Sequence, residues 1–482
     1  MKLKVFAQMQ WVMFVVLWFC FYSVMAQNHY TELAYPELRD IQIPVVDQVT
    51  LSNGMQLFLL EDHELPLIRL SARIRVGSMY EPANKIGLAA ITGSVMRSGG
   101  TASRSGDAID EALENIAASV ETQIGLDSGS ASMSVLSKDL NVGLSILADI
   151  LMNPSFPEEK IELAKLQWRS AIARRNDRAN GIAGREFRKL IYGADSVYAR
   201  HMEYATLDNI VRDDLVDLHA RFFHPNNTML AIWGDFDASK MSQKIEQIFQ
   251  DWKTQDVPSI PIPEVHYEFR QTINVIPMEG VNQTHIYMGH IGGLRNDPDY
   301  FALSLMNRIL GSGYTSRLFK EVRSRQGLAY AVFGSFSAAY EHPGMFYVGC
   351  QTHAKSTLQA IQSMKTEVTK LTESEVTAEE LELARESFLN AFVFNFDSKG
   401  EIVNRLMTYS YYGYPLDFLQ KIKEGIEKVT QADILRVAKQ RLNADKMQIL
   451  AVGPSQDFRD ALATLGDVNE IDIAIPSTAS SP

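Results

Sequence analysis

The chain has 482 residues, of which 46% are apolar and 22% charged, and its formal net charge at pH 7 is −12. This is the composition of a globular protein with enough apolar material for a large core. An acidic chain without a run of basic residues argues against nucleic acid as a partner, because binding phosphates requires clustered Lys and Arg.

The first 26 residues have the pattern of a secretory signal peptide. Lys2 and Lys4 precede the apolar run WVMFVVLWFCFYSVMA, which ends in Val24-Met25-Ala26, with small residues at positions −3 and −1. We predict cleavage after Ala26 and export to a bacterial periplasm; an uncleaved membrane anchor is the alternative. No other apolar run in the sequence is long enough to span a bilayer, so no stable membrane span is expected after cleavage.

The first half of the mature chain opens with strand signals. Asn53-Gly54 lies between two apolar runs, which predicts a β-hairpin, and LIRLSARIRVGS alternates as a half-buried strand does. A helix is expected after Ser105, a good N-cap residue. MSVLSKDL predicts a further strand, and the remainder of this half is largely helical. The predicted helix has one apolar face, made of Ile109, Leu113, Ile116 and Val120.

The second half of the chain echoes the first. Three pairs of segments recur at one offset of 220 residues: EKIELAK (Glu159–Lys165) and EELELAR (Glu379–Arg385), Tyr192-Gly193 and Tyr412-Gly413, LAIWG (Leu230–Gly234) and LAVG (Leu450–Gly453). A single match of this kind would be chance, but three in register indicate a duplication. A repeat this long predicts two homologous domains rather than a solenoid.

In each half the strand signals precede the helical ones, which predicts an α+β fold. We expect two homologous α/β sandwich domains, each with a mainly antiparallel sheet covered by helices. The stretch TQDVPSIPIPE contains three prolines and is expected to be an extended linker. The predicted boundaries are a signal peptide at 1–26, an N-terminal domain at 40–253, the linker at 254–264, a C-terminal domain at 265–470 and a disordered tail at 471–482.

Ten histidines are present, but their spacing does not favour a metal site. His219 and His224 are five residues apart and do not share a helix face. His285 and His290 have the same spacing on an expected strand, which places them on opposite faces. We therefore expect all four to be structural. Cys350 lies in the strand-like GMFYVGCQT and is expected to be a buried apolar residue rather than a nucleophile.

The segment SRLFKEVRSRQGLAYAVFGSF, residues 316–336, differs from this background. Its first part is helical, Gly327 is well placed to end the helix, and Tyr330 begins an alternating strand. Arg323 near the helix end and Tyr330 early on the strand could therefore lie close together. A guanidinium and a phenol can hold a peptide carbonyl and the oxyanion it becomes, although residue types alone favour a structural role.

GSGYTSRLFKEVRSRQGLAY, the proline-linked duplication and HPNNTMLAIWGDF together resemble the pitrilysin/insulinase family of zinc metallopeptidases, the inverzincins. The resemblance covers roughly residues 40–470. In that family a helix of the N-terminal domain carries H-x-x-E-H, whose histidines hold zinc and whose glutamate is the general base. A glutamate on a later helix is the third ligand. The resemblance implies the two-domain fold expected above.

The stretch KIGLAAITGSVMRSGGT, residues 85–101, matches the family's GLAHxxEHxxxxGT pattern without its ligands. Ala90 and Ser94 stand where the histidines belong, Gly93 stands where the base belongs, and Ala171 stands near the third ligand. These side chains cannot build a zinc site, since zinc requires imidazole, thiolate or carboxylate. We expect this to be a degenerate catalytic helix, whose small residues let a neighbouring element pack closely.

Arg323 and Tyr330, by contrast, match the family's Arg/Tyr pair at the same separation. The resemblance therefore implies a non-catalytic, substrate-gripping subunit of a heterodimeric zinc metallopeptidase. This chain would bind no metal or other cofactor and hold no catalytic residue by itself. Arg323 and Tyr330 would bind peptide substrates and support the oxyanion in trans, zinc would sit in an H-x-x-E-H partner, and peptides would bind by strand addition at a sheet edge. A catalytically inert scaffold or peptide-binding protein of the same fold is the alternative.

Overall fold

The computed structural model describes residues 44–258, 261–396 and 398–476, all within one compact unit, Ile43–Pro482. The predicted signal peptide, 1–26, lies outside these residues. Within the described ranges, no helix combines the length and apolar character that a bilayer crossing needs.

The first half of the chain builds one six-stranded sheet in the order β1-β2-β6-β3-β5-β4. Neighbouring strands are antiparallel except β2 and β6, which are parallel. Its strands are β1 (Asp47–Thr50), β2 (Gln56–Glu61), β3 (Leu67–Ile74), β4 (Ser119–Ile124), β5 (Gly129–Leu136) and β6 (Thr228–Gly234).

The second half builds another six-stranded sheet in the order β10-β12-β8-β13-β7-β14, in which β7 runs parallel to both β13 and β14. Its strands are β7 (Thr272–Pro277), β8 (Gln283–Ile291), β10 (Ala329–Phe336), β12 (Met345–His353), β13 (Gln448–Gly453) and β14 (Val468–Glu470). The order β7-β13-β8-β12-β10 repeats β2-β6-β3-β5-β4 of the first sheet. The predicted duplication and the α+β fold with mainly antiparallel sheets are thus confirmed.

Local predictions for the first sheet hold. Strands β1 and β2 pair as an antiparallel hairpin through Asn53-Gly54. Strand β3 alternates, because every second side chain points into the core and is at most 1% exposed. This alternation is the pattern of a strand with one solvated face. The inward-facing residues of β3 are Ile68, Leu70, Ala72 and Ile74.

The predicted helix after Ser105 is shorter than its apolar spacing indicates. Helix α3 (Gly106–Glu114) begins at the expected cap, where the Ser105 hydroxyl accepts a hydrogen bond from Ala108 N at 3.2 Å. It ends at Glu114, so Val120 lies in strand β4 and not on the helix. The backbone turns at Ala117, whose φ is +50°, a left-handed conformation that a right-handed helix cannot contain.

Helices cover both sheets, and helix α2 (Leu88–Ser98) contains the degenerate stretch. A short parallel pair, β9 (Gly293–Leu294) with β11 (Ala338–Ala339), accompanies the second sheet. The remaining helices are α4 (Leu140–Met152), α5 (Glu158–Ala173), α6 (Ala179–Tyr192), α7 (Tyr204–Asp208), α8 (Arg212–Phe222), α9 (Ala238–Ile248), α10 (Tyr300–Gly311), α11 (Thr357–Glu373), α12 (Ala378–Phe392), α13 (Lys399–Tyr412), α14 (Phe418–Lys428), α15 (Gln431–Arg441) and α16 (Arg459–Leu462).

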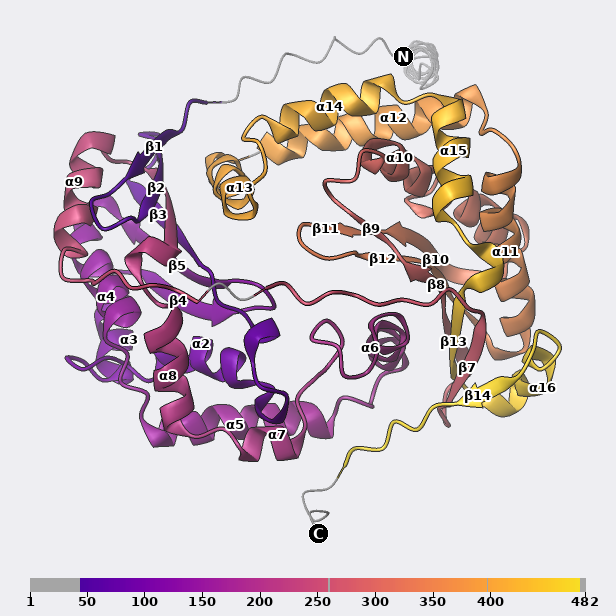
Figure 1. The fold of residues 1–482 in the computed structure, drawn as a ribbon, viewed down its shortest axis with the longest axis horizontal. Helices are drawn as coiled ribbons and strands as arrows, with labels where there is room; N and C mark the ends of the chain where they lie inside the picture. The colour runs from indigo at the N-terminus through magenta and orange to yellow at the C-terminus, as the bar shows by residue number, and fades with distance from the viewer. Residues whose placement is uncertain (1–43, 259–260, 397, 477–482) are drawn as a thin grey trace, which may run out of the picture. The chain divides into compact units, whose positions relative to one another are not determined.

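The two halves exchange one helix each. Helix α6 of the first half packs on β8 and β13 of the second sheet, where Ile182 and Phe187 join one core cluster with Leu450. Helix α13 of the second half packs on β2 and β6 of the first sheet, where Ile402 clusters with Phe58 (Figure 1). Each sheet therefore buries part of its apolar face under a helix that the other half supplies.

The exchanged helices are equivalent members of the repeat. They end at Tyr192-Gly193 and Tyr412-Gly413, one of the sequence pairs at the common offset. Both glycines have positive φ, 88° and 71°, which glycine adopts without the steric cost that other residues incur. The recurring Tyr-Gly pair thus marks the stop of a helix in both halves.

A substitution at Gly400 tests the exchange. A Cβ atom at Gly400 of α13 would lie 2.7 Å from the Trp233 ring on β6, so the two elements are in backbone-to-ring contact. We expect Gly400→Leu to lower the free energy of unfolding by about 1–3 kcal/mol, because overpacking forces helix and sheet apart. Urea unfolding measures the loss, and tryptophan fluorescence in a background with Trp168 and Trp252 replaced by Phe reports the environment of Trp233. Equal stability of variant and parent would contradict this close packing.

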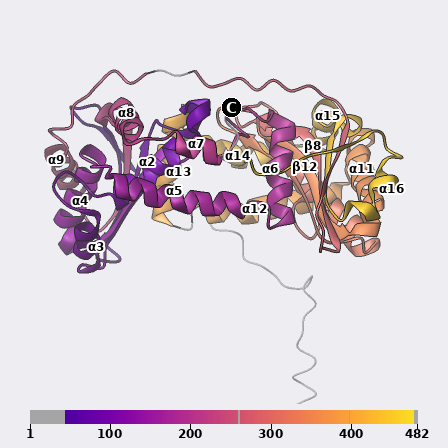
Figure 2. The same ribbon diagram turned by 90° about the horizontal axis from the view of Figure 1, so that it is seen from below.

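Two described segments without helix or strand lie at the predicted linker and at the start of the predicted tail. No helix or strand occurs in the described residues of the proline-rich stretch Thr254–Glu264, which runs as an extended segment between the sheets (Figure 2). The start of the expected disordered tail differs, because residues 471–476 are held in place. Ile471 N donates to Val275 O at 3.0 Å, and Asn176 Nδ2 donates to Ile473 O at 2.7 Å. Residues 477–482 lie outside the described ranges.

Candidate functional site

The degenerate stretch forms helix α2, and a buried carboxylate holds its start. Glu81 is only 5% exposed, and its two oxygens accept hydrogen bonds from Gly87 N at 3.1 Å and Ala89 N at 2.5 Å. These are amide groups that a helix leaves unpaired in its first turn. Burial raises the pKa of Glu81, while the two amide bonds and the nearby Arg200 oppose that rise.

Strand β4 fills the space beside Gly93. A Cβ atom at Gly93 would lie 2.8 Å from Gln123 C and closer still to Ile124 N, and the Thr122 hydroxyl donates to Gly93 O at 2.6 Å. The expectation that small residues let a neighbouring element pack closely is therefore confirmed at this position. A glutamate side chain cannot start here without moving the backbone of β4.

The other positions of the lost metal site also lack ligands. Ala90 is half-buried, Ala171 is exposed, and Ser94 donates its hydroxyl hydrogen to Ile91 O at 3.0 Å. Among the described residues, no group of three or more His, Cys, Asp and Glu side chains could hold a metal ion. A donor set of one hydroxyl does not fit zinc, so we derive no chemistry through a metal in this chain.

Ala90 and Ala171 nevertheless lie together, on the wall of one cavity of about 450 Å³. Helices α2 and α5 bound this cavity, and Ile124 at the end of β4 closes part of it. The sequence comparison that places the third ligand near Ala171 is thus consistent with the fold, because that position faces the same space as Ala90.

The second predicted feature, the Arg/Tyr pair, is brought together. Arg323 lies on a π-helical segment, Phe319–Arg325, and Tyr330 lies at the start of β10. The Arg323 guanidinium carbon is 5.5 Å from the centroid of the Tyr330 ring and 4.7 Å from that of Phe319. The segment ends as predicted before Gly327, where Leu328 N donates to Val322 O at 2.9 Å.

The pair is available to a ligand. The Tyr330 residue is 77% exposed, and β10 is an edge strand of its sheet. Arg325, two residues further on, is in an ion pair with Glu321. Arg323 lies within ion-pair distance of no carboxylate in the part of the chain that the structure describes, and its guanidinium lies over two aromatic rings instead. This arrangement can offer several N–H donors and one O–H donor to a carbonyl or an oxyanion.

Three of the histidines and the cysteine are held in the protein interior or by backbone carbonyls. His219 and His224 each bond to a backbone carbonyl at 2.8 Å, and His290 is fully buried on β8. Burial lowers the pKa of both His219 and His290 to about 4, so both are neutral at pH 7. Cys350 is 2% exposed, and burial raises the pKa of its thiol to about 12, which keeps it protonated and unreactive.

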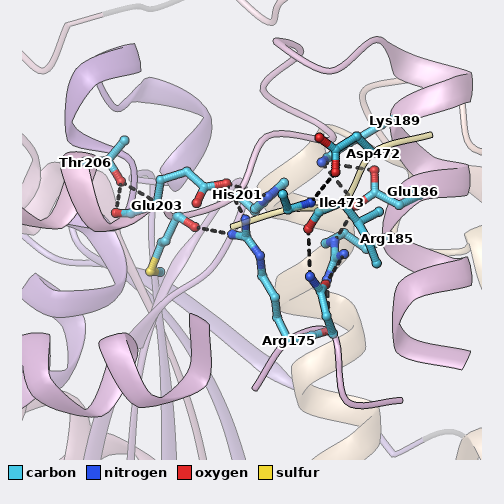
Figure 3. A network of polar contacts seen from close by, with 12 residues as sticks. Arg175, Arg185, Glu186, Lys189, His201, Glu203, Thr206, Asp472 and Ile473 are labelled. Carbon is cyan, nitrogen blue, oxygen red and sulfur yellow. Dashed lines mark hydrogen bonds and ion pairs between the residues drawn. The ribbon is translucent and has the colours of Figure 1, made fainter. Parts of the chain in front are cut away.

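Sequence reasoning missed a polar network beside the cavity (Figure 3). Arg175 donates to Glu203 Oε1 at 2.8 Å, and His201 Nε2 lies 3.0 Å from the same oxygen. Arg200 donates to Ser78 O and Glu81 O at 2.8 and 2.9 Å. Arg175 lies just after the end of α5, in the stretch IARRNDRA, residues 172–179. Its partners are near residue 200, and no local sequence pattern connects the two segments.

Comparison with known proteins gives the same assignment over most of the chain. Residues 59–188 match the model of the insulinase family, peptidase family M16, and residues 209–388 match that of the peptidase M16 inactive domain. Together the two matches span more than half of the 482 residues.

Curated relatives span nearly the same length. An uncharacterized zinc protease of Rickettsia bellii is 26% identical over 84% of this chain and 97% of its own. A protein named non-peptidase homolog YmxG, of Helicobacter pylori, is 21% identical over 83% of this chain and 90% of its own. The relatives thus include both a zinc protease and a non-peptidase by name.

Solved structures agree. A peptidase M16 inactive domain from Pseudomonas fluorescens superposes with a TM-score of 0.76 and 25% identity, covering 85% of this chain and 98% of that one. A Helicobacter pylori protease of 18% identity shares the fold, with a TM-score of 0.74, 85% of this chain and 99% of its own covered. The chain therefore belongs to the insulinase family, peptidase family M16.

Proposed function

We propose that this chain is the non-catalytic, substrate-gripping subunit of a periplasmic heterodimeric zinc metallopeptidase. One observation carries the proposal: the Arg323–Tyr330 pair is assembled and exposed, whereas Ala90, Gly93 and Ser94 of α2 leave no metal ligands. A protein that acts only as a scaffold has no need of an exposed donor pair. The inactive-domain match and the non-peptidase relative support a chain without chemistry of its own.

The partner in this proposal is a separate M16 chain with an intact H-x-x-E-H helix, which supplies the zinc and the general base. In the pair, Tyr330 O–H and the Arg323 guanidinium donate to the scissile carbonyl. These donors act most strongly on the oxyanion, because charge develops there in the transition state. The pattern of residues 1–26 supports export, so we place the pair in the periplasm.

Peptides in this proposal bind by strand addition. Strand β4 is an edge strand of the first sheet and packs against α2, and β10 is an edge strand of the second. An extended peptide would pair with such an edge through main-chain hydrogen bonds, which are indifferent to its sequence. Tolerance of many sequences is what degradation or processing of peptides requires.

Reconstitution tests the proposal. We expect the purified chain, produced without residues 1–26, to contain no stoichiometric zinc and to cleave no casein-derived peptides. Adding an M16 family member with an intact H-x-x-E-H helix from the same organism should produce chelator-sensitive hydrolysis that neither chain shows alone. Metal analysis and peptide mass spectrometry provide the readouts. Chelator-sensitive hydrolysis by the single chain would refute the proposal, and a partner that is fully active alone would favour the inert scaffold.

A further inference from the structure

We propose that the cavity between α2 and α5 binds a carboxylate carried next to an apolar group, as at the C-terminal residue of a peptide. The cavity occupies the place of the lost metal site and would recognise an anionic end of the ligand. The inference extends the proposed function by naming a peptide feature. It depends on neither the partner nor zinc, since this chain alone supplies every residue of the cavity.

The apolar part of the cavity suits one side chain. Its volume of about 450 Å³ is within the usual range of small-ligand sites, roughly 300–1,000 Å³. Alanines at positions 90 and 171, instead of metal ligands, leave this volume open. The apolar lining residues include Ile86, Ala90, Ile124, Leu126, Trp168 and Ile172.

The polar part of the cavity is cationic. Arg175, Arg185 and Arg200 line it, together with one acid, Glu81. The Glu81 carboxylate accepts hydrogen bonds from the first turn of α2 and interacts with the charge of Arg200, but the two are not in an ion pair. Arg175 and Arg185 have carboxylate partners of their own, Glu203 and Glu186.

Arg200 is the one arginine of the three without an ion-pair partner. Its hydrogen bonds go to two neutral carbonyl oxygens, and within the described residues no carboxylate is at ion-pair distance from it. Burial lowers the pKa of Arg200, which is the mark of a cation held in a poorly solvated place. Glu81 stabilises the Arg200 charge only from beyond ion-pair distance, so a ligand carboxylate on this wall would be the first to accept its N–H groups in a charge-assisted bond.

The network around Arg175 is also incomplete. Arg175 Nε, His201 Nδ1 and Glu203 Oε2 are buried and have no hydrogen-bond partner among the described residues (Figure 3). Burial lowers the pKa of His201, which favours its neutral ring, and its Nε2 lies 3.0 Å from Glu203 Oε1. Buried hydrogen-bond donors and acceptors without partners are expected where a ligand completes a site.

The surroundings already hold extended chain. Arg185 donates to Asn176 Oδ1 at 2.8 Å, and Asn176 in turn donates to the backbone carbonyl of Ile473 at 2.7 Å. The segment 471–476 is extended and passes this network (Figure 3). On the other side, Ile124 ends the edge strand β4, so a peptide added to β4 would reach the cavity. Charge and backbone geometry therefore both favour a peptide carboxylate over an isolated anion.

Calorimetry on the single chain, produced without residues 1–26, tests the inference with three pentapeptides. One ends in leucine with a free carboxylate, one is its C-terminal amide, and one is an amide with an internal glutamate before the leucine. We expect the free acid to bind about 10- to 100-fold more tightly than the plain amide, as charge-assisted hydrogen bonds provide. Tight binding of the glutamate peptide would assign the carboxylate to a side chain instead of the chain end.

Variants locate the site. Arg175→Gln should remove most of the preference for the acid, whereas Arg174→Gln, an exposed neighbour that does not line the cavity, should leave it intact. Ala171→Phe should abolish binding of all three peptides by filling the cavity from an exposed position. Equal affinity for acid and amide, or no binding of either, would overturn the inference. Either result leaves the proposed function standing if the chain still activates its partner.

Discussion

Replacing Tyr330 by phenylalanine is expected to lower kcat of the assembled peptidase by up to about 100-fold, which is the usual effect of removing one oxyanion donor. The substitution removes only the O–H and keeps the ring on which the Arg323 guanidinium lies, 5.5 Å from its centroid. The donor matters most in the transition state, so KM should change far less than kcat. Steady-state kinetics with a fixed amount of partner separate the two effects.

Tyr314 provides the matched control. It is 79% exposed, and its ring lies 5.0 Å from Phe319, on the side of the same helical segment. Tyr314→Phe removes a similarly exposed hydroxyl, and among the described residues no arginine lies over the Tyr314 ring, so kcat should remain at the parent value. If Tyr330→Phe leaves kcat unchanged as well, the tyrosine has no role in catalysis and the Arg/Tyr pair is structural.

The sequence predicted those parts of the fold that local patterns determine. The hairpin at Asn53-Gly54, the alternation of β3 and the helix stop before Gly327 each depend on a few neighbouring residues. The Arg323–Tyr330 contact was predictable for the same reason, because one short helix-to-strand turn joins the two residues. The duplication was visible in the sequence because some of its markers have the same structural role in both halves, as the Tyr-Gly pair that ends a helix does.

The exchange of α6 and α13 between the halves could not be predicted from the sequence. The apolar face of α6 shows that the helix packs on something, but Ile182 and Phe187 would suit either sheet. Only the three-dimensional packing decides that α6 and α13 cross to the other half.

The cavity could not be predicted from local sequence patterns either. Its walls come from α2, the end of β4, α5 and the segment around residue 200, which are distant in sequence. The sequence did show that ligands were missing, but not what replaced them. The end of α3 was mispredicted because apolar spacing continued through Ile116 and Val120, past a left-handed backbone turn at Ala117.

Restoring the family's base by Gly93→Glu is expected to lower the free energy of unfolding by about 3 kcal/mol or more, at the upper end of overpacking effects. The new Cβ would lie 2.8 Å from Gln123 C, and main chain cannot yield as a flexible side chain does. Ser94→His, on the exposed face of the same helix, should change stability by less than about 0.5 kcal/mol. Urea unfolding of the single chain measures both.

A quadruple variant tests whether the site lacks only its ligands or also the space for them. It combines Ala90→His, Gly93→Glu, Ser94→His and Ala171→Glu. If only the ligands had been replaced, restoring them would recreate a zinc site and stoichiometric zinc would appear in the purified protein. Because the backbone of β4 lies where a glutamate side chain at position 93 would start, we expect metal analysis to find none. A stable quadruple variant that holds one zinc per chain would contradict this expectation. It would show that β4 can shift to make room for the glutamate and that the backbone still permits the geometry of a zinc site.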